Sequence, residues 1–463
     1  MKWKGYPKYK ESGVDWLGPV PGHWEIKRLD FLASVKARLG WKGLTASEYV
    51  DDGYVFLATP NIKGEKGINF ENVNFISEER YLESPEIMLQ KDDVLIAKDG
   101  STLGITNIVR ELPRPATVNS SIAVIRSNGR INGYYLFRWI CGYFMQAKIE
   151  SFKDGQGVPH LFQADIRKFP VLLPEASEQT AIANFLDRET GRLDTLIAKK
   201  QALSGLLKEK RTALISQTVT RGLPPDAARE FGLAPHTRFK DSGEKWIGDI
   251  PFAWEIKPVK SIAHVGNGST PNRDNPLFWE DGDFPWLNSS VVNLEEVVQA
   301  DQFVTKDALS NCHLPVIEPP AVLIGITGQG KTRGLATTLL IKATINQHIA
   351  FVKPIRNSYG IGYLRRVFDM AYLFLRNESD GGGSTKGAIT CEQIKSLRIP
   401  FPLIAEQTAI ATYLDRETKK LDTLITKIET AITRLQEYRT ALITAAVTGK
   451  IDVRDHASKK EAA

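Results

Sequence analysis

The sequence has few cysteines and no long hydrophobic run. Only three of its 463 residues are cysteine (Cys141, Cys312 and Cys391), and none forms a C-x-x-C pair. This scattered odd count excludes a disulfide framework and favours a reducing compartment. No run approaches the roughly 20 apolar residues of a membrane-spanning helix, and the N-terminal MKWKGYPKYK lacks the apolar segment of a secretory signal. We therefore expect a cytoplasmic protein without a membrane partner.

A strong excess of charge of one sign is also lacking. Lys and Arg total 60 and Asp and Glu total 54, which gives a net charge of +6. With 42% hydrophobic and 25% charged residues, the composition matches soluble globular proteins and excludes a mostly disordered chain. The mild basicity permits a nucleic-acid partner without requiring one. At roughly 150 residues per domain, the length predicts about three folding units.

The sequence contains two copies of the same pattern. Residues 9–27 (YKESGVDWLGPVPGHWEIK) return 230 positions later as residues 239–257 (FKDSGEKWIGDIPFAWEIK). Residues 178–197 (EQTAIANFLDRETGRLDTLI) return 228 positions later as residues 406–425 (EQTAIATYLDRETKKLDTLI). The period is far too long for a solenoid. The chain is therefore a tandem duplication of one module, in which a globular part precedes a helical part.

The two globular parts, about 20–170 and 250–398, resemble each other much less. Their short apolar runs lie between Gly, Pro, Asn and Asp, which predicts strands. Aromatic and aliphatic residues at helical spacing predict short helices near 132–149 and 359–376. The fold class is therefore α+β. The predicted strands include residues 94–96, 121–125, 322–324 and 349–352.

The helical parts show an alternating spacing of four and three. It extends from Ile182 to Leu214 and from Ile410 to Leu442, and we place Leu196 and Leu424 on the apolar seam. Such a seam is typical of a coiled coil, so we expect the two long helices to pack antiparallel on each other. The alternative is that each helix packs on its own globular core. A helix of about 30 residues is about 45 Å long, which exceeds the face of a small domain and favours the coiled coil.

These patterns divide the chain into six parts. Three prolines, Pro224, Pro225 and Pro235, mark a linker that ends the first helix. The charged, alanine-rich tail after Lys450 is expected to fray. The predicted parts are a first globular domain (1–175), a first helix (176–218), the linker (219–238), a second globular domain (239–402), a second helix (403–449) and a flexible tail (450–463).

The duplicated plan resembles the specificity subunit of type I restriction–modification enzymes. The resemblance covers essentially the whole chain. It rests on the opening pattern Ser12-Gly13…Trp16-Leu17-Gly18…Pro21…Trp24 with its copy at 242–254, on the doubled EQTAIA-x-x-LD-x-E-T block, and on the R-T-A-L-I…V-T stretches. It implies two target recognition domains on an antiparallel helix pair. A specificity subunit of a system with a fused nuclease–methyltransferase partner stays open, because only the partner distinguishes it.

The resemblance also implies partners and cofactors. Double-stranded DNA, two methyltransferase (modification) subunits and restriction subunits are the expected partners. S-adenosylmethionine, ATP and Mg are expected on those subunits, so this chain would hold no catalytic, cofactor or metal residue. Two unlike recognition domains predict a bipartite, asymmetric target. A spacer of about 45 Å suits half-sites centred about one duplex turn, 34 Å, apart.

Contacts to DNA are expected from loops, because Arg, Lys, Asn and Gln read base edges while Lys, Arg, Ser and Thr hold phosphates. In the first domain the candidates are Lys36, Arg38, Lys42, Asn61, Lys63, Lys98, Ser101, Thr102 and His160. In the second they are Asn267, Ser269, Thr270, Asn272, Arg273, Asn288, Ser289, Gln329, Lys331, Arg333 and Lys386. Asn346, Gln347 and His348 either contact DNA or pin a strand. Partner contacts are predicted on the outer helix faces and the EQTAIA turns, at Glu178, Gln179, Ile182, Glu406, Gln407 and Ile410.

One motif supports a different class of protein. Residues 325–332 (GITGQGKT) satisfy the P-loop pattern G-x-x-x-x-G-K-[ST], so a nucleotide-binding ATPase is the alternative function. A P-loop runs directly into a helix, whereas Arg333-Gly334 and a β-branched stretch follow here, and the copy at 100–104 lacks the lysine. We therefore interpret the loop as a hairpin tip facing DNA. Asn275-Pro276-Leu277-Phe278, which misses the N-P-P-[FY] motif of adenine methyltransferases, is interpreted as a turn.

Overall fold

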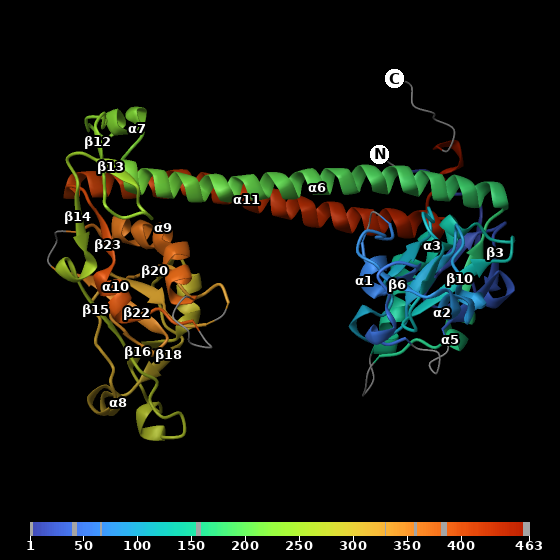
Figure 1. The fold of residues 1–463 in the computed structure, drawn as a ribbon, viewed down its shortest axis with the longest axis horizontal. Helices are drawn as coiled ribbons and strands as arrows, with labels where there is room; N and C mark the ends of the chain where they lie inside the picture. Colours follow the sequence, from blue (N-terminus) through green and yellow to red (C-terminus); the bar gives the residue numbers. More distant parts are fainter. Residues whose placement is uncertain are drawn as a thin grey trace. The chain divides into compact units, whose positions relative to one another are not determined.

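The computed structural model describes residues 3–38, 44–64, 67–153, 159–328, 330–355, 359–380 and 387–456 (Figure 1). The chain divides into two compact units. The first unit comprises Met1–Ala202 with Ile428–Ala463, and the second comprises Leu203–Lys427. Each unit contains one globular domain and a part of each long helix, α6 (Ala176–Arg221) and α11 (Ile404–Val447). The predicted duplication and the α+β class are both present.

The first domain is built on a four-stranded antiparallel sheet in the order β4-β10-β7-β8, beside a three-stranded sheet β6-β5-β9. A hairpin β1-β2 and a pair β3-β11 complete it. The strands are β1 (Tyr9–Glu11), β2 (Pro19–Pro21), β3 (Glu25–Arg28), β4 (Ala33–Ala37), β5 (Tyr54–Leu57), β6 (Asn74–Ile76), β7 (Val94–Ala97), β8 (Thr106–Ile108), β9 (Ala116–Val118), β10 (Ile122–Ser127) and β11 (Pro170–Leu173). The short helices are α1 (Thr59–Ile62), α2 (Glu78–Leu82), α3 (Gly133–Ile140), α4 (Tyr143–Glu150) and α5 (Gln163–Arg167).

The second domain repeats this plan with additions. Its main sheet has the order β15-β22-β19-β20-β17, and β18-β16-β21 forms the smaller sheet. The strands are β12 (Phe239–Asp241), β13 (Asp249–Pro251), β14 (Glu255–Pro258), β15 (Ala263–Asn267), β16 (Phe284–Leu287), β17 (Glu296–Val297), β18 (Gln302–Val304), β19 (Ala321–Gly325), β20 (Ala336–Leu339), β21 (Thr344–Ile345), β22 (Ile349–Pro354) and β23 (Arg398–Phe401). The short helices are α7 (Pro225–Glu230), α8 (Lys306–Asn311), α9 (Ile361–Asp380) and α10 (Cys391–Ser396).

The unbroken apolar runs are central strands that are buried on both faces. In β7, Val94 and Ile96 pack into one hydrophobic core of the first domain, while Leu95 and Ala97 pack into the other. Successive side chains of a strand point to opposite faces, so a strand between two cores needs apolar residues at every position. Strand β19 divides its side chains in the same way between two cores of the second domain. The strand predictions at these places are confirmed.

Both long helices contribute to both globular cores. The core of the first unit buries Ile182 near the start of α6 and Val447 at the end of α11. The core of the second unit buries Ile410 near the start of α11 and Val219 near the end of α6. Within each unit, the start of one helix therefore lies with the end of the other, and the helices are antiparallel as predicted. Packing on the domain's own core, the alternative prediction, occurs as well.

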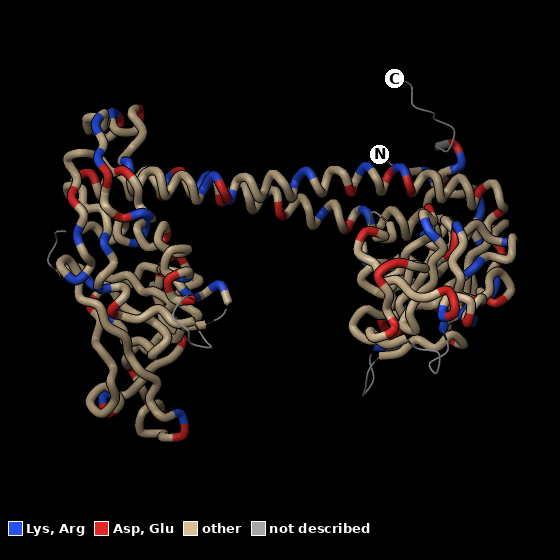
Figure 2. The backbone as a smooth tube through the Cα atoms, in the orientation of Figure 1, with Lys and Arg blue, Asp and Glu red and all other residues tan. Residues whose placement is uncertain are grey.

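Two ion pairs between the helices repeat at equivalent positions. In the first unit, Arg439 Nε of α11 lies 2.7 Å from Asp194 Oδ1 of α6. In the second unit, Arg211 Nε of α6 lies 2.8 Å from Asp422 Oδ1 of α11. The members of one pair stand 228 positions from their counterparts in the other. Lys, Arg, Asp and Glu occur along both helices (Figure 2), and these reciprocal pairs fix the antiparallel register.

The predicted apolar seam is wrong by one residue in the middle of the helices. Ile197 and Ile425 are buried, at 5% and 7% exposure, whereas Leu196 and Leu424 are 42% and 47% exposed. Thr190, Ile197 and Ser204 are buried at intervals of seven residues, so the repeat is kept and every second predicted position there is displaced by one residue. The helices have 46 and 44 residues, close to the predicted ranges 176–218 and 403–449 and longer than the roughly 30 residues of the length estimate.

A buried carboxylate holds the start of α6 on its own domain. Glu178 is 4% exposed and accepts hydrogen bonds from the Tyr6 hydroxyl at 2.6 Å and the Trp24 indole at 3.1 Å. His23 Nε2 lies 2.9 Å from its second oxygen. Burial, followed by the hydrogen bond to Glu178, raises the pKa of the Tyr6 hydroxyl well above its ordinary value. Because Glu178 lies in the first helical turn, the helix dipole also favours its charge.

The same contact recurs at the start of α11. Glu406 accepts a hydrogen bond from the Trp254 indole at 2.9 Å, and His236 Nε2 lies 2.6 Å from its other oxygen. His236 stands 230 positions after Tyr6, and Trp254 stands 230 positions after Trp24. The opening pattern and the EQTAIA block are thus two sides of one contact. Their spacing in the sequence is repeated because this contact is repeated.

A second repeated contact joins each helix to its domain nine residues, or about two and a half turns, further along. Arg138 Nη2 lies 2.5 Å from Asp187 Oδ1, and Arg366 Nη2 lies 2.6 Å from Asp415 Oδ1. Burial acts to raise the pKa of Asp187, but the hydrogen bond from Arg110 and the charge of Arg138 outweigh it and lower that pKa. The carboxylate is therefore held in its charged form. Each helix is tied to its domain by one carboxylate from its first turn and one further along.

The linker and the tail contain more structure than predicted. Helix α6 ends at Arg221, and Gly222 follows with a φ of +82°, which suits a helix end. Helix α7 then forms within the predicted linker, with Pro225 at its first position, where the missing N–H costs nothing. In the predicted flexible tail, Ile451 and Val453 are buried in the core of the first unit. Only residues 457–463 of that tail lie outside the described residues.

The Glu178 contact yields a stability prediction. Replacing Glu178 with Gln removes the charge and leaves one buried donor, on Tyr6 or Trp24, without an acceptor. We expect the free energy of unfolding to fall by about 2–3 kcal/mol. The matched control Glu175→Gln, at an exposed position just before the helix, should leave it unchanged. Urea unfolding and hydrogen exchange of the segment 6–24 measure both effects, and equal behaviour of the two variants would contradict the account.

Candidate nucleic-acid interface

Three loops of the first domain converge at the end of its central strand β7. The Lys98 amide donates to the Ser121 carbonyl at 2.8 Å, and the Leu161 amide donates to the Lys98 carbonyl at 2.8 Å. Asp99 and His160 form an isolated β-bridge beside them. The three segments are therefore held by their backbones. We call residues 98–104, 119–121 and 159–162 the first loop cluster.

The second domain holds the corresponding loops with the same backbone contacts. The Ile326 amide donates to the His348 carbonyl at 2.9 Å, and the Ile389 amide donates to the Ile326 carbonyl at 2.8 Å. The donors and acceptors therefore follow the same plan in both domains. We call the described residues of 326–334, 346–348 and 387–389 the second loop cluster.

An asparagine turn is common to both clusters. Asn119 Oδ1 accepts from the Ser121 amide at 3.2 Å, and Asn346 Oδ1 accepts from the His348 amide at 3.0 Å. Such a side chain satisfies the backbone two residues on and fixes the turn. Of the two roles considered for Asn346, the pinning role is the one that the structure shows. The side chains of Gln347 and His348 take no part in this backbone contact.

A glycine closes the tip loop of each cluster against a helix behind it. Gly104 and Gly334 both have a φ of +90°, a conformation that glycine adopts without strain. A Cβ at Gly104 would lie 2.9 Å from the Ile149 side chain, and one at Gly334 would lie 3.1 Å from the Tyr372 ring. Because only glycine permits this approach, the two tip loops have the same anchored base despite their different lengths.

The side chains on the first cluster form a compact charged group. His160 Nδ1 pairs with Asp99, and Lys98 Nζ lies 3.4 Å from the same carboxylate. Phe162 is 60% exposed and meets the His160 ring edge-on, with 4.3 Å between ring centroids. The first cluster therefore presents an ionic group next to an exposed aromatic ring. Sequence reasoning missed Asp99 and Phe162, although Asp99 lies within the tip-loop motif itself.

The second cluster carries a chain of hydrogen bonds among Thr, Gln and His side chains in that place. The Thr270 hydroxyl lies 2.7 Å from Gln347 Oε1, Gln347 Nε2 lies 3.2 Å from His348 Nε2, and His348 Nδ1 lies 2.7 Å from the Thr327 hydroxyl. This chain also connects the loop after β15 to the cluster. The two domains thus use one backbone scaffold with different side-chain chemistry.

The glycine-rich loop at 325–332 is a hairpin connection, as predicted. Strand β19 ends at Gly325 and antiparallel strand β20 begins at Ala336, so the loop leads into a strand rather than a helix. Its backbone is engaged by α9, because the Tyr372 hydroxyl donates to the Lys331 carbonyl at 3.0 Å and Arg376 Nη1 to the Gly330 carbonyl at 2.7 Å. A phosphate-binding loop presents its amides to the ligand at a helix N-terminus. The nucleotide-binding alternative therefore has no support.

Most of the predicted DNA-binding residues lie at the surface, but in different places. The exposed ones are Lys36, Lys63, Ser101, Asn272, Arg273 and Lys331, and the partly exposed ones are Thr102, His160, Asn267, Ser269, Thr270, Asn288 and Ser289. The loop clusters bring together Lys98, Ser101, Thr102 and His160 in one domain and Lys331 and Arg333 in the other. Lys98 is itself largely buried. Lys42, Gln329 and Lys386 lie outside the described residues.

Three of the predicted DNA-binding residues are structural instead. Arg38 is 3% exposed and donates to Ser84 Oγ at 3.3 Å, and its burial, followed by the charge of Arg80, lowers its pKa. Asn61 is 8% exposed and donates to a backbone carbonyl at 2.7 Å. Arg333 is 3% exposed and donates to Asp380 Oδ1 at 2.6 Å. Since these side chains are inside the domains, they are not available to DNA in this structure.

The residues predicted to bind partner subunits also point inward. Gln179 Oε1 accepts from the Asn132 amide at 2.8 Å, and Gln407 Oε1 accepts from the Gly360 amide at 2.7 Å. The likeness of the two copies here therefore comes from docking each helix on its own domain, and these side chains are not available to a partner. The buried or largely buried set is Glu178, Gln179, Ile182, Glu406, Gln407 and Ile410.

Two surface hollows lie at equivalent places on the long helices. In the first unit a hollow of about 850 Å³ is lined by residues that include Thr195 and Lys199 of α6. In the second unit a hollow of about 740 Å³ is lined by residues that include Thr423 and Lys427 of α11. Each of these pairs is separated by 228 positions. The helices therefore present two related surfaces, one in each unit.

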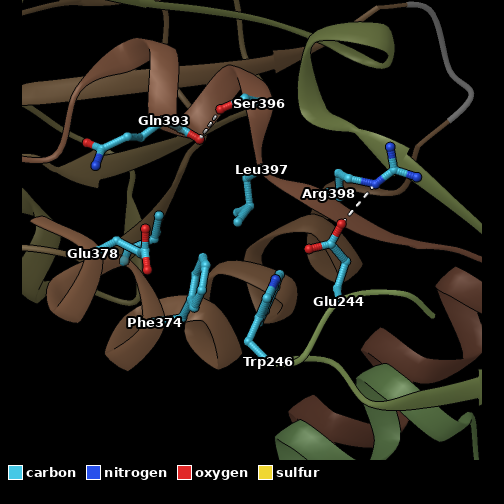
Figure 3. Close-up of a pocket in the computed structure, with 9 residues that line it drawn as sticks. Glu244, Trp246, Phe374, Glu378, Gln393, Ser396, Leu397 and Arg398 are labelled. Atoms are coloured by element: carbon cyan, nitrogen blue, oxygen red, sulfur yellow. Dashed lines mark hydrogen bonds and ion pairs between the residues drawn. The ribbon is translucent and has the colours of Figure 1, made fainter. Parts of the chain in front are cut away.

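A smaller cavity in the second domain is separate from the loops. It measures about 170 Å³ (Figure 3). One side is formed by the rings of Trp246 and Phe374, which stack with 5.0 Å between their centroids, and the other side by helix α10. An ion pair between Arg398 Nε and Glu244 Oε1, at 3.0 Å, borders it. The second loop cluster contributes no residue to its lining. We therefore assign this cavity to the packing of the β12–β13 hairpin loop on α9.

Three features of other protein classes are not found in the described part of the chain. No three His, Cys, Asp or Glu side chains there lie close enough together to hold a metal ion. None of its helices has both the length and the apolar character needed to cross a bilayer. The three cysteines are free thiols.

Comparison with known proteins gives one family. The family described as the type I restriction modification DNA specificity domain matches residues 21–203 and again residues 251–434. Each match contains most of one globular domain and the first part of the long helix that follows it. The matches therefore repeat the duplication seen in the sequence.

Individual relatives agree with this result. The chain is 22% identical over 456 residues to the type I restriction enzyme MjaVIII specificity subunit of Methanocaldococcus jannaschii. The aligned region covers 94% of this chain and 95% of that subunit. It is 27% identical over 186 residues to the EcoR124I/EcoR124II specificity subunit of Escherichia coli, covering 40% and 45%. A chain solved in work on complex assembly and conformational transition of the type I R-M system superposes with a TM-score of 0.64 at 18% identity, covering 93% and 99%. That likeness shows the same fold.

Proposed function

The chain belongs to the family of type I restriction modification DNA specificity domains, and from this premise we propose that its two loop clusters read the two parts of an interrupted, asymmetric DNA target. It is a specificity subunit with two recognition domains. The observation that carries the proposal is the pair of loop clusters with one backbone scaffold and different side chains. Different side chains on equivalent loops select different bases, so the two parts of the target differ in sequence.

The proposed DNA contacts are of two kinds, those to phosphates and those to base edges. The exposed lysines Lys36, Lys63 and Lys331 are suited to phosphates, because a lysine is a point charge on a flexible stem. His160 and Gln347, on the two clusters, are suited to base edges because their donors and acceptors are fixed by neighbours. Each phosphate contact releases counterions, so binding weakens steeply as salt concentration rises.

The chemistry of the complex is proposed to lie on the partner subunits. S-adenosylmethionine would bind to the modification subunits, and ATP and Mg to the restriction subunits. Two features of this chain support that division. The glycine-rich loop is a hairpin, and Asn275 caps a short 3₁₀ turn, Pro276–Phe278, by accepting from the Leu277 amide at 3.2 Å. The two segments that resemble catalytic motifs, residues 325–332 and 275–278, thus form local turns in this chain.

The partner surface is proposed to be the pair of hollows on the long helices. Leu196 and Leu424 follow the lining residues Thr195 and Thr423 in the two copies of the LDTLI motif, and they are 42% and 47% exposed. Internal packing does not account for a leucine kept exposed at both positions. Two equivalent surfaces suit two copies of one partner, so we assign one modification subunit to each hollow. Restriction subunits would join that complex.

The first prediction concerns the target. Mapping of methylated adenines in the native host should show an interrupted motif that loses methylation when this gene is deleted. His160→Ala should relax one part of the motif and Gln347→Ala the other, because each residue lies on one cluster. Glu11→Ala, at an exposed position of the β1–β2 hairpin, serves as the control. An unchanged map after deletion, or an effect of one variant on both parts, would contradict the proposal.

The second prediction concerns assembly. Leu196→Asp and Leu424→Asp each place a charge next in the chain to a lining residue of one hollow. Each should remove one modification subunit, while the double variant removes both. Native mass spectrometry of the purified complex counts the bound subunits. Leu373→Asp makes the same change at a leucine on α9 that is 61% exposed, and this control should keep two. If all variants retain two subunits, the partner surface lies elsewhere.

A further inference from the structure

The side chain of Arg273 is held by its neighbours on the surface of the second domain. It is exposed in the loop between β15 and β16, and its guanidinium carbon lies 4.0 Å from the Trp279 ring centroid and 4.8 Å from that of Trp286. Its Nη2 donates to Gln302 Oε1 at 3.0 Å. Arginine side chains at a surface usually sample many rotamers, and here contacts with two aromatic rings and one hydrogen bond restrict them.

The two indoles also fix the loop on both sides of Arg273. The Trp279 Nε1 donates to the Asn272 carbonyl at 2.9 Å, and the Trp286 Nε1 donates to the Ser269 carbonyl at 3.1 Å. Trp286 is 2% exposed and belongs to a small hydrophobic core beneath the loop. The backbone that carries Arg273 is therefore anchored to a packed core.

The same loop reaches the second loop cluster. Thr270, three residues before Arg273, contacts Gln347 at 2.7 Å. Arg273 is therefore adjacent in the chain to the group of side chains proposed to read DNA. It differs from Arg333, whose guanidinium is buried against Asp380. Arg273 forms no ion pair with any carboxylate in the described part of the chain, so its charge is not neutralised within it.

From this arrangement we infer that Arg273 reads a guanine in the part of the target recognised by the second domain. The inference rests on the proposed function. Arginine recognises guanine by donating in parallel to the N7 and O6 acceptors in the major groove, and this contact requires a guanidinium plane of fixed direction. Two indole rings at 85° to each other and the hydrogen bond to Gln302 together restrict the direction of the guanidinium. A phosphate contact needs only the charge, which the lysines of the loops also offer.

The test compares Arg273→Lys with Arg273→Ala in the complex with modification subunits. The lysine variant keeps the charge but loses the planar pair of donors. Competition binding to duplexes that vary one base pair at a time through the whole motif measures the preference at each position. Both variants should reduce the preference for one guanine about tenfold or more, in one part of the target only. All other positions should keep their wild-type preference.

A matched control is Arg238→Lys. Arg238 is also exposed, and its guanidinium carbon lies over the Phe252 ring, 4.7 Å from the centroid, in the hairpin region of the same unit. The Arg238→Lys variant should therefore leave the base preference at every position unchanged. An unchanged motif in the Arg273 variants, with wild-type melting temperature, would overturn the inference. A uniform loss of affinity that Arg273→Lys restores would overturn it too, because it would show a phosphate contact. If the wild-type complex selects no interrupted motif, the proposed function itself fails.

Discussion

The fold depends on a buried carboxylate in the first turn of each long helix. Glu178 and Glu406 each accept an indole hydrogen bond from a tryptophan in the opening segment of their own repeat. A charged acceptor inside a protein is stable only when donors satisfy it, so this contact fixes the helix start against one strand-and-turn segment. Every other feature of the module builds on that junction, because the helix, the central sheet and the loops beyond it then have one arrangement within each unit.

The duplication preserves what the junction requires and varies what faces outward. The reciprocal pairs Arg439–Asp194 and Arg211–Asp422, the helix-docking carboxylates and the glycine-anchored tip loops recur in both units. Apart from the asparagine of the turn, the side chains on the loop clusters differ. A DNA reader with two domains needs this combination, since a common scaffold gives both domains a common way to meet a duplex while different side chains select different bases.

Much of this organisation follows from the sequence. The repeat, the strands and the long helices could be predicted because apolar periodicity and repeated blocks report directly on packing. The inward direction of Gln179 and Gln407 could not, because identity between repeats is produced equally by an internal contact and by a partner contact. The burial of Arg38 and Arg333 was also hidden, since nothing in a loop sequence shows that a distant carboxylate or carbonyl will meet the guanidinium. The seam at Leu196 was misplaced because its spacing fits two helical registers that differ by one residue.

The most direct test is hydrogen–deuterium exchange of the chain in its modification complex, with and without a duplex that carries the methylated motif. The account predicts that both loop clusters gain protection on binding the full motif, and that a duplex containing only one part protects only one of them. Protection confined to the long helices, or equal protection of both clusters by either part alone, would contradict the claim that each domain reads its own part of the target.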